Sequence, residues 1–231
     1  MSSPLAIFEI TWYGHSCFSI YNKMIGLKIF FDPYGRNTGK FKLPKNEGDI
    51  VLCSHDHFDH SNCEAVAKWD AVKFTKLIGD RNIKDVKIRG VEAYHDDAGG
   101  KIRGTTAIYI VGYGDGIFVH LGDLGHILTD KEISRIQVFG RPHVLFVPVG
   151  GVYTIGPNEA VTVIRQINPK IAIPMHYYSE KLNPAIFGKL HRLGEFLRVW
   201  DGPVERFSSN SIEVDVNTLP TETTVYVLEQ P

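Results

Sequence analysis

The stretch Cys53-Ser54-His55-Asp56-His57-Phe58-Asp59-His60 decides how this chain is expected to fold. It follows Ile50-Val51-Leu52, an apolar run that is too short for a helix and predicts a buried strand. After it, Ser61 and Glu64 have the spacing of a capping box, which predicts a helix from residue 62 to residue 69 or 70. The histidines and aspartates are therefore expected in a loop between two rigid elements, where chemistry is commonly placed.

The residue types in this stretch indicate a metal site. Neutral imidazole and carboxylate are the natural nitrogen and oxygen ligands of zinc, and manganese or iron accepts the same set. In a turning loop His55 and His57 can converge on one ion, while Asp59 and His60 face a neighbouring position. The spacing therefore favours two divalent metal ions. The alternative is a solvated, histidine-rich loop that takes up metal only by accident.

The motif His55-x-His57-x-Asp59-His60 resembles the histidine motif of the metallo-β-lactamase fold superfamily, whose members are mostly hydrolases with one or two metals. Later stretches look like motifs of its uncharacterised bacterial and archaeal Zn-dependent hydrolase branch, related to ascorbate-phosphate lactonase. They are Gly122-Asp123-Leu124-Gly125-His126, Pro148-Val149-Gly150-Gly151-Val152-Tyr153-Thr154 and Ile173-Pro174-Met175-His176-Tyr177. The likeness runs from about Thr11 to Tyr178. It implies a four-layer αββα sandwich that forms a single domain over residues 1–231.

Three further ligands are expected at the ends of apolar strands. His95 is placed like the third ligand of the first metal, although a lone histidine in such a position is usually a surface or core residue. Asp123 is expected to bridge the ions, which a shared carboxylate holds about 3.5 to 4 Å apart; otherwise it caps a turn. His176 completes the second site. The expected ligand sets are His55, His57 and His95 for one ion, and Asp59, His60 and His176 for the other, with Asp123 shared.

Four other residues are candidates for the surroundings of the metals. By the resemblance, Asp32 orients a ligand histidine, or it caps the loop that follows it. His15 lies in a Gly-His-Ser pattern of the family and either faces the pocket or is a buried structural histidine. His126 and Tyr177 are expected to border the pocket.

The remaining pattern predicts the other elements. Strands are expected over 7–12, 17–21, 27–31, 72–78, 86–88, 91–94, 105–111, 116–121, 144–149, 170–173, 197–200, 211–216 and 223–228, and helices over 129–138 and 157–167. The loop over residues 35–48 carries Lys40, Lys42 and Lys45, which either meet an anionic substrate or form an ordinary solvated surface.

Composition limits the classes of function. The chain has 231 residues, enough for one substantial α/β domain, and a formal net charge of -1, so nothing draws it as a whole to long nucleic acids or membranes. We expect a cytoplasmic protein without a signal segment or a membrane span.

The three cysteines show no C-x-x-C spacing, so no disulfide framework is expected, and Cys17 and Cys53 are interpreted as core thiols. Self-association stays open.

Together these features predict a metal-dependent hydrolase with a small-molecule substrate. A metal-bridging hydroxide would attack an ester, a lactone or a phosphodiester, and Asp59 would orient it or carry a proton to the leaving group. Two rivals remain. The same ligands could hold a di-iron centre of an oxidoreductase, or the chain could be a non-catalytic, metal-stabilised binding protein, against which the pair Asp59 and Asp123 counts.

Overall fold

A computed structural model describes residues 6–231 of the chain. Its first sheet has six strands in the order β13-β1-β2-β3-β4-β5. The strands are β1 (Ile7–Trp12), β2 (Phe18–Asn22), β3 (Leu27–Phe31), β4 (Gly48–Cys53), β5 (Ala67–Thr75) and β13 (Ser211–Asp215). Strands β1 to β3 form an antiparallel meander, whereas β4 lies parallel to both β3 and β5.

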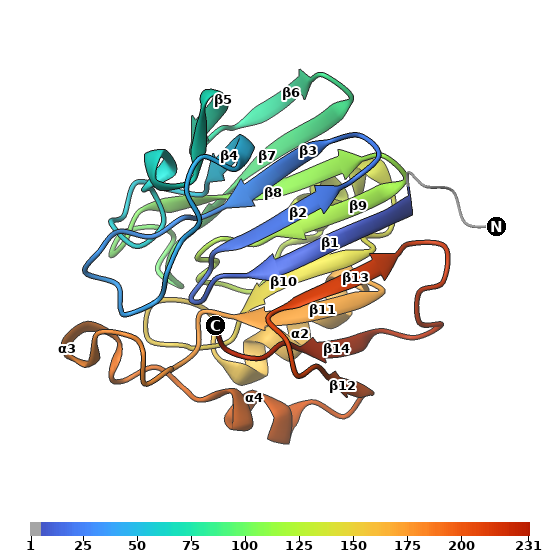
Figure 1. The fold of residues 1–231 in the computed structure, drawn as a ribbon. Coiled ribbons are helices and arrows are strands. Elements are labelled where there is room, and N and C mark those ends of the chain that lie inside the picture. The colour runs from blue at the N-terminus through green and yellow to red at the C-terminus, as the bar shows by residue number, and fades with distance from the viewer. Residues whose placement is uncertain (1–5) are drawn as a thin grey trace.

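The second sheet has eight strands in the order β12-β14-β11-β10-β9-β8-β7-β6. They are β6 (Gly79–Ile83), β7 (Val86–Tyr94), β8 (Thr105–Tyr113), β9 (Gly116–His120), β10 (Val144–Pro148), β11 (Ile171–Met175), β12 (Val204–Arg206) and β14 (Thr224–Val227). Figure 1 shows the blue strands β1 to β3 lying over β8 to β10 of this sheet. The expected α/β class with two facing sheets is confirmed.

Helices α1 (Asp130–Ile136), α2 (Pro157–Ile167) and α4 (Leu193–Val199) accompany the second sheet, and α3 (Pro184–Phe187) is a short turn near the loops (Figure 1). The first sheet has a different cover on its outer side. There, Tyr34 and Phe41 from the loop after β3 pack beside Val66 and Cys63 of a 3₁₀ turn, Cys63–Ala65. An irregular segment therefore takes the place of a helical layer on that side.

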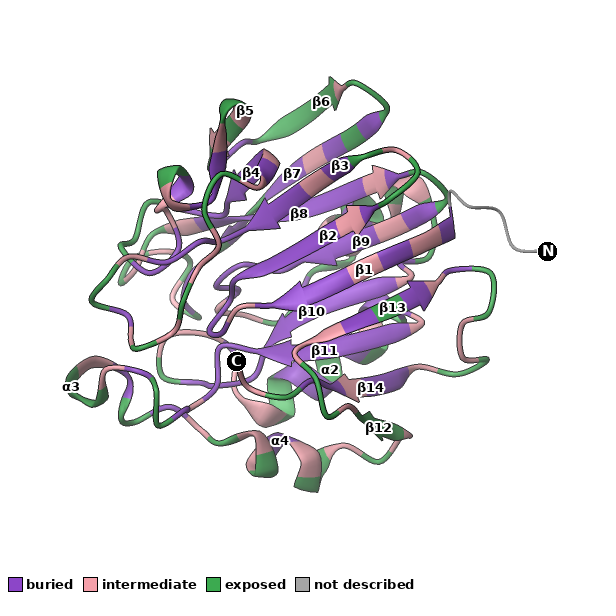
Figure 2. Cartoon of the chain, viewed as in Figure 1, coloured by how far each residue is buried: buried purple, intermediate pink, exposed green. Residues whose placement is uncertain are grey.

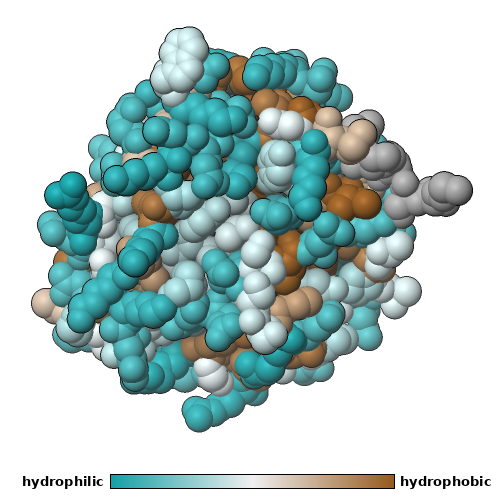
Figure 3. Space-filling view, viewed as in Figure 1, coloured by the Kyte–Doolittle hydropathy of each residue, from teal (hydrophilic) through white to brown (hydrophobic). Residues whose placement is uncertain are grey.

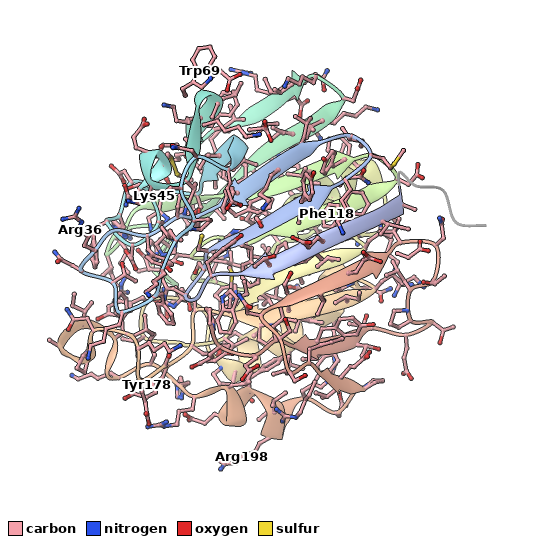
Figure 4. The ribbon with its side chains drawn as sticks, viewed as in Figure 1. Arg36, Lys45, Trp69, Phe118, Tyr178 and Arg198 are labelled. Atoms are coloured by element: carbon pink, nitrogen blue, oxygen red, sulfur yellow. A yellow bond between two sulfur atoms is a disulfide. The ribbon has the colours of Figure 1, made fainter. Side chains whose placement is uncertain are left out.

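The core lies between the sheets, where the strands of both are buried (Figure 2). Phe8 on β1 packs edge-on against Phe118 on β9, with ring centroids 4.9 Å apart, and Phe18 on β2 meets Phe146 on β10 at 4.4 Å. Figure 4 labels Phe118 among the strands. Full burial of such a side chain stabilises the fold by about 1.5 to 3 kcal/mol, so these pairs fix how the sheets stack.

Two tyrosines of β8 also join the sheets through their hydroxyl groups. Tyr113 donates a hydrogen bond to the carbonyl of Leu27 at 2.6 Å, and Tyr109 donates to that of Cys53 at 2.9 Å. A buried hydroxyl needs such a partner. Because Cys53 ends β4, the second bond sets the height of the histidine-rich loop above the second sheet.

The helix predicted over residues 62–70 is wrong. Only the 3₁₀ turn Cys63–Ala65 forms, and β5 begins at Ala67 and pairs with β4. The capping box does not form because the Ser61 hydroxyl donates to the carbonyl of His57 and the Glu64 carboxylate accepts a hydrogen bond from Lys73. The open edge of β4 and the burial of Val66 outweigh the local signal.

Other differences have similar causes. Residues 197–200 were predicted as a strand, but residues 197–199 belong to α4 and Trp200 follows its end, because the Glu195 side chain accepts a hydrogen bond from the Arg192 backbone and Phe196 is buried. The two short strands predicted over 86–94 form one strand, β7, and the polar partner β6 was not predicted. Cys53 and Cys63 form a disulfide, so the interpretation of Cys53 as a thiol is wrong; Cys17 is a buried free cysteine.

Several predictions agree with the structure. Helix α2 has the predicted bounds, Pro157–Ile167, and α1 begins after Thr129 with a complete capping box to Glu132. The hairpin of β8 and β9 is also present. Within residues 6–231, none of the helices has the length and apolarity that a membrane crossing requires. The face in Figure 3 is mostly hydrophilic, with scattered hydrophobic patches.

Candidate metal centre

The expected ligands gather where strands of both sheets end. His55 follows β4, His95 follows β7, Asp123 lies three residues after β9, and His176 follows β11. Strands β9, β10 and β11 are parallel, and β7 runs in the same direction because it is antiparallel to β8, which is antiparallel to β9. Their carboxyl ends therefore open at one edge, where the β4 loop meets them.

Asp123 stands at the middle of this cluster. Its Oδ2 lies 3.2 Å from His60 Nε2, 3.2 Å from His95 Nε2 and 3.4 Å from His176 Nε2. His55 Nε2 is 3.9 Å away. Burial tends to raise the pKa of the Asp123 carboxyl, but the charges of His176 and His60 hold that pKa well below its usual range. The carboxylate is therefore ionised among imidazole nitrogens.

The other predicted ligands lie on two sides of Asp123. On one side His55 Nε2 is 2.9 Å from His57 Nδ1, and the donor atoms of His55, His57 and His95 lie within 4.8 Å of one another. On the other side Asp59 Oδ2 is 3.4 Å from His60 Nε2 and belongs to a cluster with His15, His60 and His176. The structure thus brings all seven predicted ligands together in two groups.

The chemistry of these atoms fits metal ions. Among residues 6–231, the buried atoms His60 Nε2, His176 Nε2 and Asp123 Oδ1 have no hydrogen-bond partner. Buried polar atoms are normally paired, and unpaired ones cost about 1 to 3 kcal/mol each. Nitrogen donors that converge on a carboxylate without partners of their own are the arrangement that a cation would satisfy.

Asp32 holds two of the histidines in position from behind. Its Oδ2 lies 2.8 Å from His60 Nδ1 and accepts a hydrogen bond of 2.7 Å from the Ser54 hydroxyl, while Oδ1 accepts one from Ser54 N. Since that hydroxyl gives its proton to Asp32, it must accept from His55 Nδ1, 2.9 Å away. Both histidines therefore carry their proton on Nδ1 and present Nε2 to the cluster. Ser54 was not singled out, although it lies within the motif.

His120 fixes the loop that carries Asp123. Its Nε2 donates to the carbonyl of Ser16 at 2.9 Å and its Nδ1 accepts from Gly122 N at 3.1 Å, so both ring nitrogens are used within the fold. Gly122 has a φ of +53°, and a Cβ there would lie 2.7 Å from the Ser54 Cβ. Only glycine permits this close approach of the two loops.

The other residues predicted near the pocket, His15, His126 and Tyr177, lie in three different surroundings. His15 is buried and its Nε2 lies 3.0 Å from Asp59 Oδ2; burial, with a smaller contribution from His176, lowers the pKa of His15 to about 4. His126 does not line the cavity beside the cluster but lines the neighbouring hollow; its Nε2 accepts from Tyr94 N, and its Nδ1 lies 2.9 Å from the carbonyl of Ile127. Tyr177 packs on Trp12, with centroids 5.5 Å apart, and lies outside the cavity beside the cluster.

A cavity of about 300 Å³ opens beside the cluster. It is lined by His57, Phe58, Asp59, His95, Arg103, Asp123, Tyr153, Ile186 and Phe187. Lys40, Lys42 and Lys45 do not line it; Lys45 and Arg36 border a separate hollow, and Figure 4 shows both on that loop. Arg103 and Phe187 carried no sequence signal for this place, and Tyr153 was known only as part of the motif over residues 148–154, because the three loops are far apart along the chain.

Comparison with known proteins identifies the family of this chain. Residues 9–176 match the model of the beta-lactamase superfamily domain. The chain belongs to the metallo-β-lactamase superfamily. As a member of this superfamily it is a metal-dependent hydrolase, and the model spans the cluster from His15 to His176.

Among similar members of the superfamily is a UPF0173 metal-dependent hydrolase of Staphylothermus marinus, 33% identical over 212 residues, which covers 78% of this chain and 90% of the relative. One from Thermoplasma volcanium is 29% identical over 192 residues, 73% of this chain and 83% of the relative. A Thermotoga maritima structure, assigned to the Zn-dependent hydrolases of the superfamily, has 33% identity and a TM-score of 0.77, and the match covers 97% of this chain and all of that one.

Proposed function

We propose that this hydrolase binds two divalent metal ions, most simply zinc, and hydrolyses an ester, a lactone or a phosphodiester of a small substrate. The observation that carries the proposal is the convergence of three histidine Nε2 atoms within 3.4 Å of the buried Asp123 Oδ2. The assignment of the Thermotoga maritima protein to Zn-dependent hydrolases supports zinc. The cavity of about 300 Å³ suits a small molecule.

In this proposal Asp123 is shared between the two groups of donors. The ligand sets are His55, His57 and His95 on one side and Asp59, His60 and His176 on the other. A cluster of His15 with Asp59 and His176 makes His15 a further candidate on the second side. When bound, the ions would supply Lewis acidity and make a water acidic enough to ionise near neutral pH.

The residues of the chain supply the rest of the reaction. Asp59 lines the cavity, and its Oδ2 faces His15 Nε2 at 3.0 Å, which holds the carboxylate in one orientation. Asp59 would take a proton from the attacking water and pass it to the leaving oxygen, so that one water becomes part of the acid and alcohol products. Phe58 and Phe187 line the cavity and would provide an apolar contact surface for the substrate beside the reacting groups.

A di-iron oxidoreductase is the rival that uses the same ligands. A structural neighbour, CmlA, a diiron β-hydroxylase from Streptomyces venezuelae, has a TM-score of 0.55 and 10% identity, so it shares the fold alone. Metal analysis separates the two functions, because iron with visible absorption would favour the rival, whereas colourless zinc protein would favour hydrolysis.

The test is the metal content of the purified protein by elemental mass spectrometry, with ester, lactone and phosphodiester hydrolysis measured on the same samples. The wild type is expected to hold nearly two ions per chain. Asp123→Ala and His176→Ala should lose metal and reduce hydrolysis by at least about 100-fold, since removal of a ligand costs more than removal of its hydrogen-bond partner.

The matched control is His143→Asn. His143 directly precedes β10, away from the ligand-bearing strand ends, and its Nδ1 accepts from Ile117 N, a bond that the asparagine oxygen can replace. This variant should keep both metal and activity. One ion or none in the wild type, unchanged by either substitution of a ligand, would refute the two-metal centre.

A further inference from the structure

Arg103 is the unexplained charge in the cavity beside the metal centre. Of the nine residues in the described range 6–231 that line this cavity, it is the only lysine or arginine. The others are the acids and histidines of the cluster, and the apolar or aromatic residues Phe58, Tyr153, Ile186 and Phe187. The reaction described above gives the Arg103 guanidinium no part.

The fold holds Arg103 in a definite place. Asp96, directly after the ligand His95, is buried, and its carboxylate accepts four backbone hydrogen bonds from the loop that follows. The last of these comes from Arg103 N at 2.7 Å. Burial tends to raise the pKa of the Asp96 carboxyl, but these four hydrogen bonds hold that pKa below its usual range. The loop is therefore tied at the residue that carries the guanidinium.

The side chain of Arg103 is also oriented. Its guanidinium carbon lies 5.5 Å from the centroid of the Tyr153 ring, and the Tyr153 hydroxyl donates to the carbonyl of Ile186 at 2.8 Å. Within residues 6–231, no carboxylate forms an ion pair with this guanidinium. Arginine seated on an aromatic face keeps the edge of its fork free, and that edge matches the two oxygens of a carboxylate or phosphate.

The surroundings define where an anion could sit. Arg103 and Tyr153 also line a second hollow of about 410 Å³, which Asp96, Asp97 and Glu159 border. These acids would repel an anion that moved further into that hollow. An anionic group is therefore favoured at the wall between the two hollows, beside Arg103, and an apolar part of the same molecule would contact Phe58 and Phe187.

We propose that Arg103, seated on Tyr153, binds a carboxylate or phosphate group of the substrate at a position separate from the bond that is hydrolysed. The inference rests on the proposed hydrolase function and narrows its substrate class to anionic esters, lactones or phosphodiesters with an apolar segment. In this proposal Arg103 selects substrates that carry an anionic group, and Asp59 with the metal-ligand residues carries out the hydrolysis.

The test compares para-nitrophenyl esters of hexanoic acid, of adipic acid and of a phosphorylated hydroxyhexanoic acid with the metal-loaded, full-length protein. The acyl chains match in length and differ only in their neutral, carboxylate or phosphate end. The wild type should hydrolyse at least one anionic ester with a kcat/KM about 10- to 100-fold above the neutral one, as expected for hydrogen bonds to charged groups. The preferred end group identifies the anion.

Arg103→Met should remove this preference and leave hydrolysis of the neutral ester and metal content unchanged. Arg103→Lys should keep part of the preference, because it retains the charge without the planar fork. Lys101→Met is the matched control: it removes the same charge from an exposed position of the same loop that lines neither hollow, and it should change nothing.

The outcomes separate the two proposals. No hydrolysis of any ester, lactone or phosphodiester by the wild type would overturn the proposed function. Hydrolysis without any preference for an anionic ester would overturn only the role of Arg103. Equal losses for neutral and anionic esters in Arg103→Met would also overturn it, because they would mark Arg103 as a structural residue of the cavity.

Discussion

At the scale of single residues, Asp32 shows how much of the centre depends on a group that faces away from the cavity. It is fully buried and pairs with Ser54 and His60. Burial tends to raise the pKa of Asp32, but the charges of His120 and His60 lower it below its usual range. Its φ of +44° is a conformation that asparagine adopts more readily than other side chains. Asparagine can therefore replace it without additional backbone strain.

Asp32→Asn is expected to weaken metal affinity about 10- to 100-fold, because the amide no longer fixes the Nδ1 proton of His60. Competition with a chelator measures the affinity. The control is Asp49→Asn, which removes a carboxylate bound by Lys28 N and Lys68 Nζ on the same sheet. Equal affinity in wild type and Asp32→Asn would show that His60 is held by other contacts.

At the scale of elements, the strand-end loops pack so closely that some positions have no room for a side chain. A Cβ on Gly150, after β10, would lie 1.9 Å from the carbonyl oxygen of His176, after β11. Gly150→Ala should therefore displace His176, lower the free energy of unfolding by about 1 to 3 kcal/mol, and reduce the metal content. Urea unfolding and elemental analysis measure both effects.

Gly194 offers the matched glycine for this experiment. It lies in α4, and no atom of the described part of the chain stands within 4 Å of the position its Cβ would take. Gly194→Ala should leave metal content unchanged and either keep the stability or raise it by up to about 1 kcal/mol. Similar losses in both variants would mean that the close packing at Gly150 does not hold His176 in place.

At the scale of the whole molecule, buried histidines tie the stability of the metal-free protein to pH. Burial, with a smaller contribution from His176, lowers the pKa of His15 to about 4. Burial, with a smaller contribution from His60, lowers the pKa of His55 to about 3. In the unfolded chain these histidines take up protons below about pH 6.5. Their contribution to stability is therefore complete above pH 6.5 and is lost as the pH falls toward 4.

His60 does not cancel this loss. Burial tends to lower its pKa, but Asp123, Asp59 and Asp32 raise it well above the usual value, so its contribution is present below pH 6.5 and lost only at higher pH. Between about pH 6.5 and pH 4.5 the metal-free protein should lose on the order of 3 kcal/mol, visible in the urea midpoint. His15→Gln should reduce the slope, and a midpoint that stays level would contradict the prediction.

The sequence alone predicted the parts of the fold that rest on local chemistry. The strand before His55, the capping box of α1 at Thr129 and the bounds of α2 were predicted because apolar periodicity and caps act over a few neighbouring residues. The same reasoning failed over residues 62–70, where pairing of β5 with β4 outweighs a good capping signal. It failed again at Cys63, whose disulfide partner is set by the stacking of the turn on the sheet.

The candidate site also combines features that the sequence predicts with contacts that only the tertiary structure determines. The motif at His55 and the strand-end positions of His95, Asp123 and His176 were enough to predict a metal cluster. Each of these ligands is a histidine or aspartate at the end of an apolar run, which can be recognised in the sequence. The relay from Asp32 through Ser54, the placing of Tyr177 outside the cavity and the seat of Arg103 on Tyr153 were decided only by the tertiary structure. These contacts join segments far apart in the chain, and their geometry depends on how the two sheets stack.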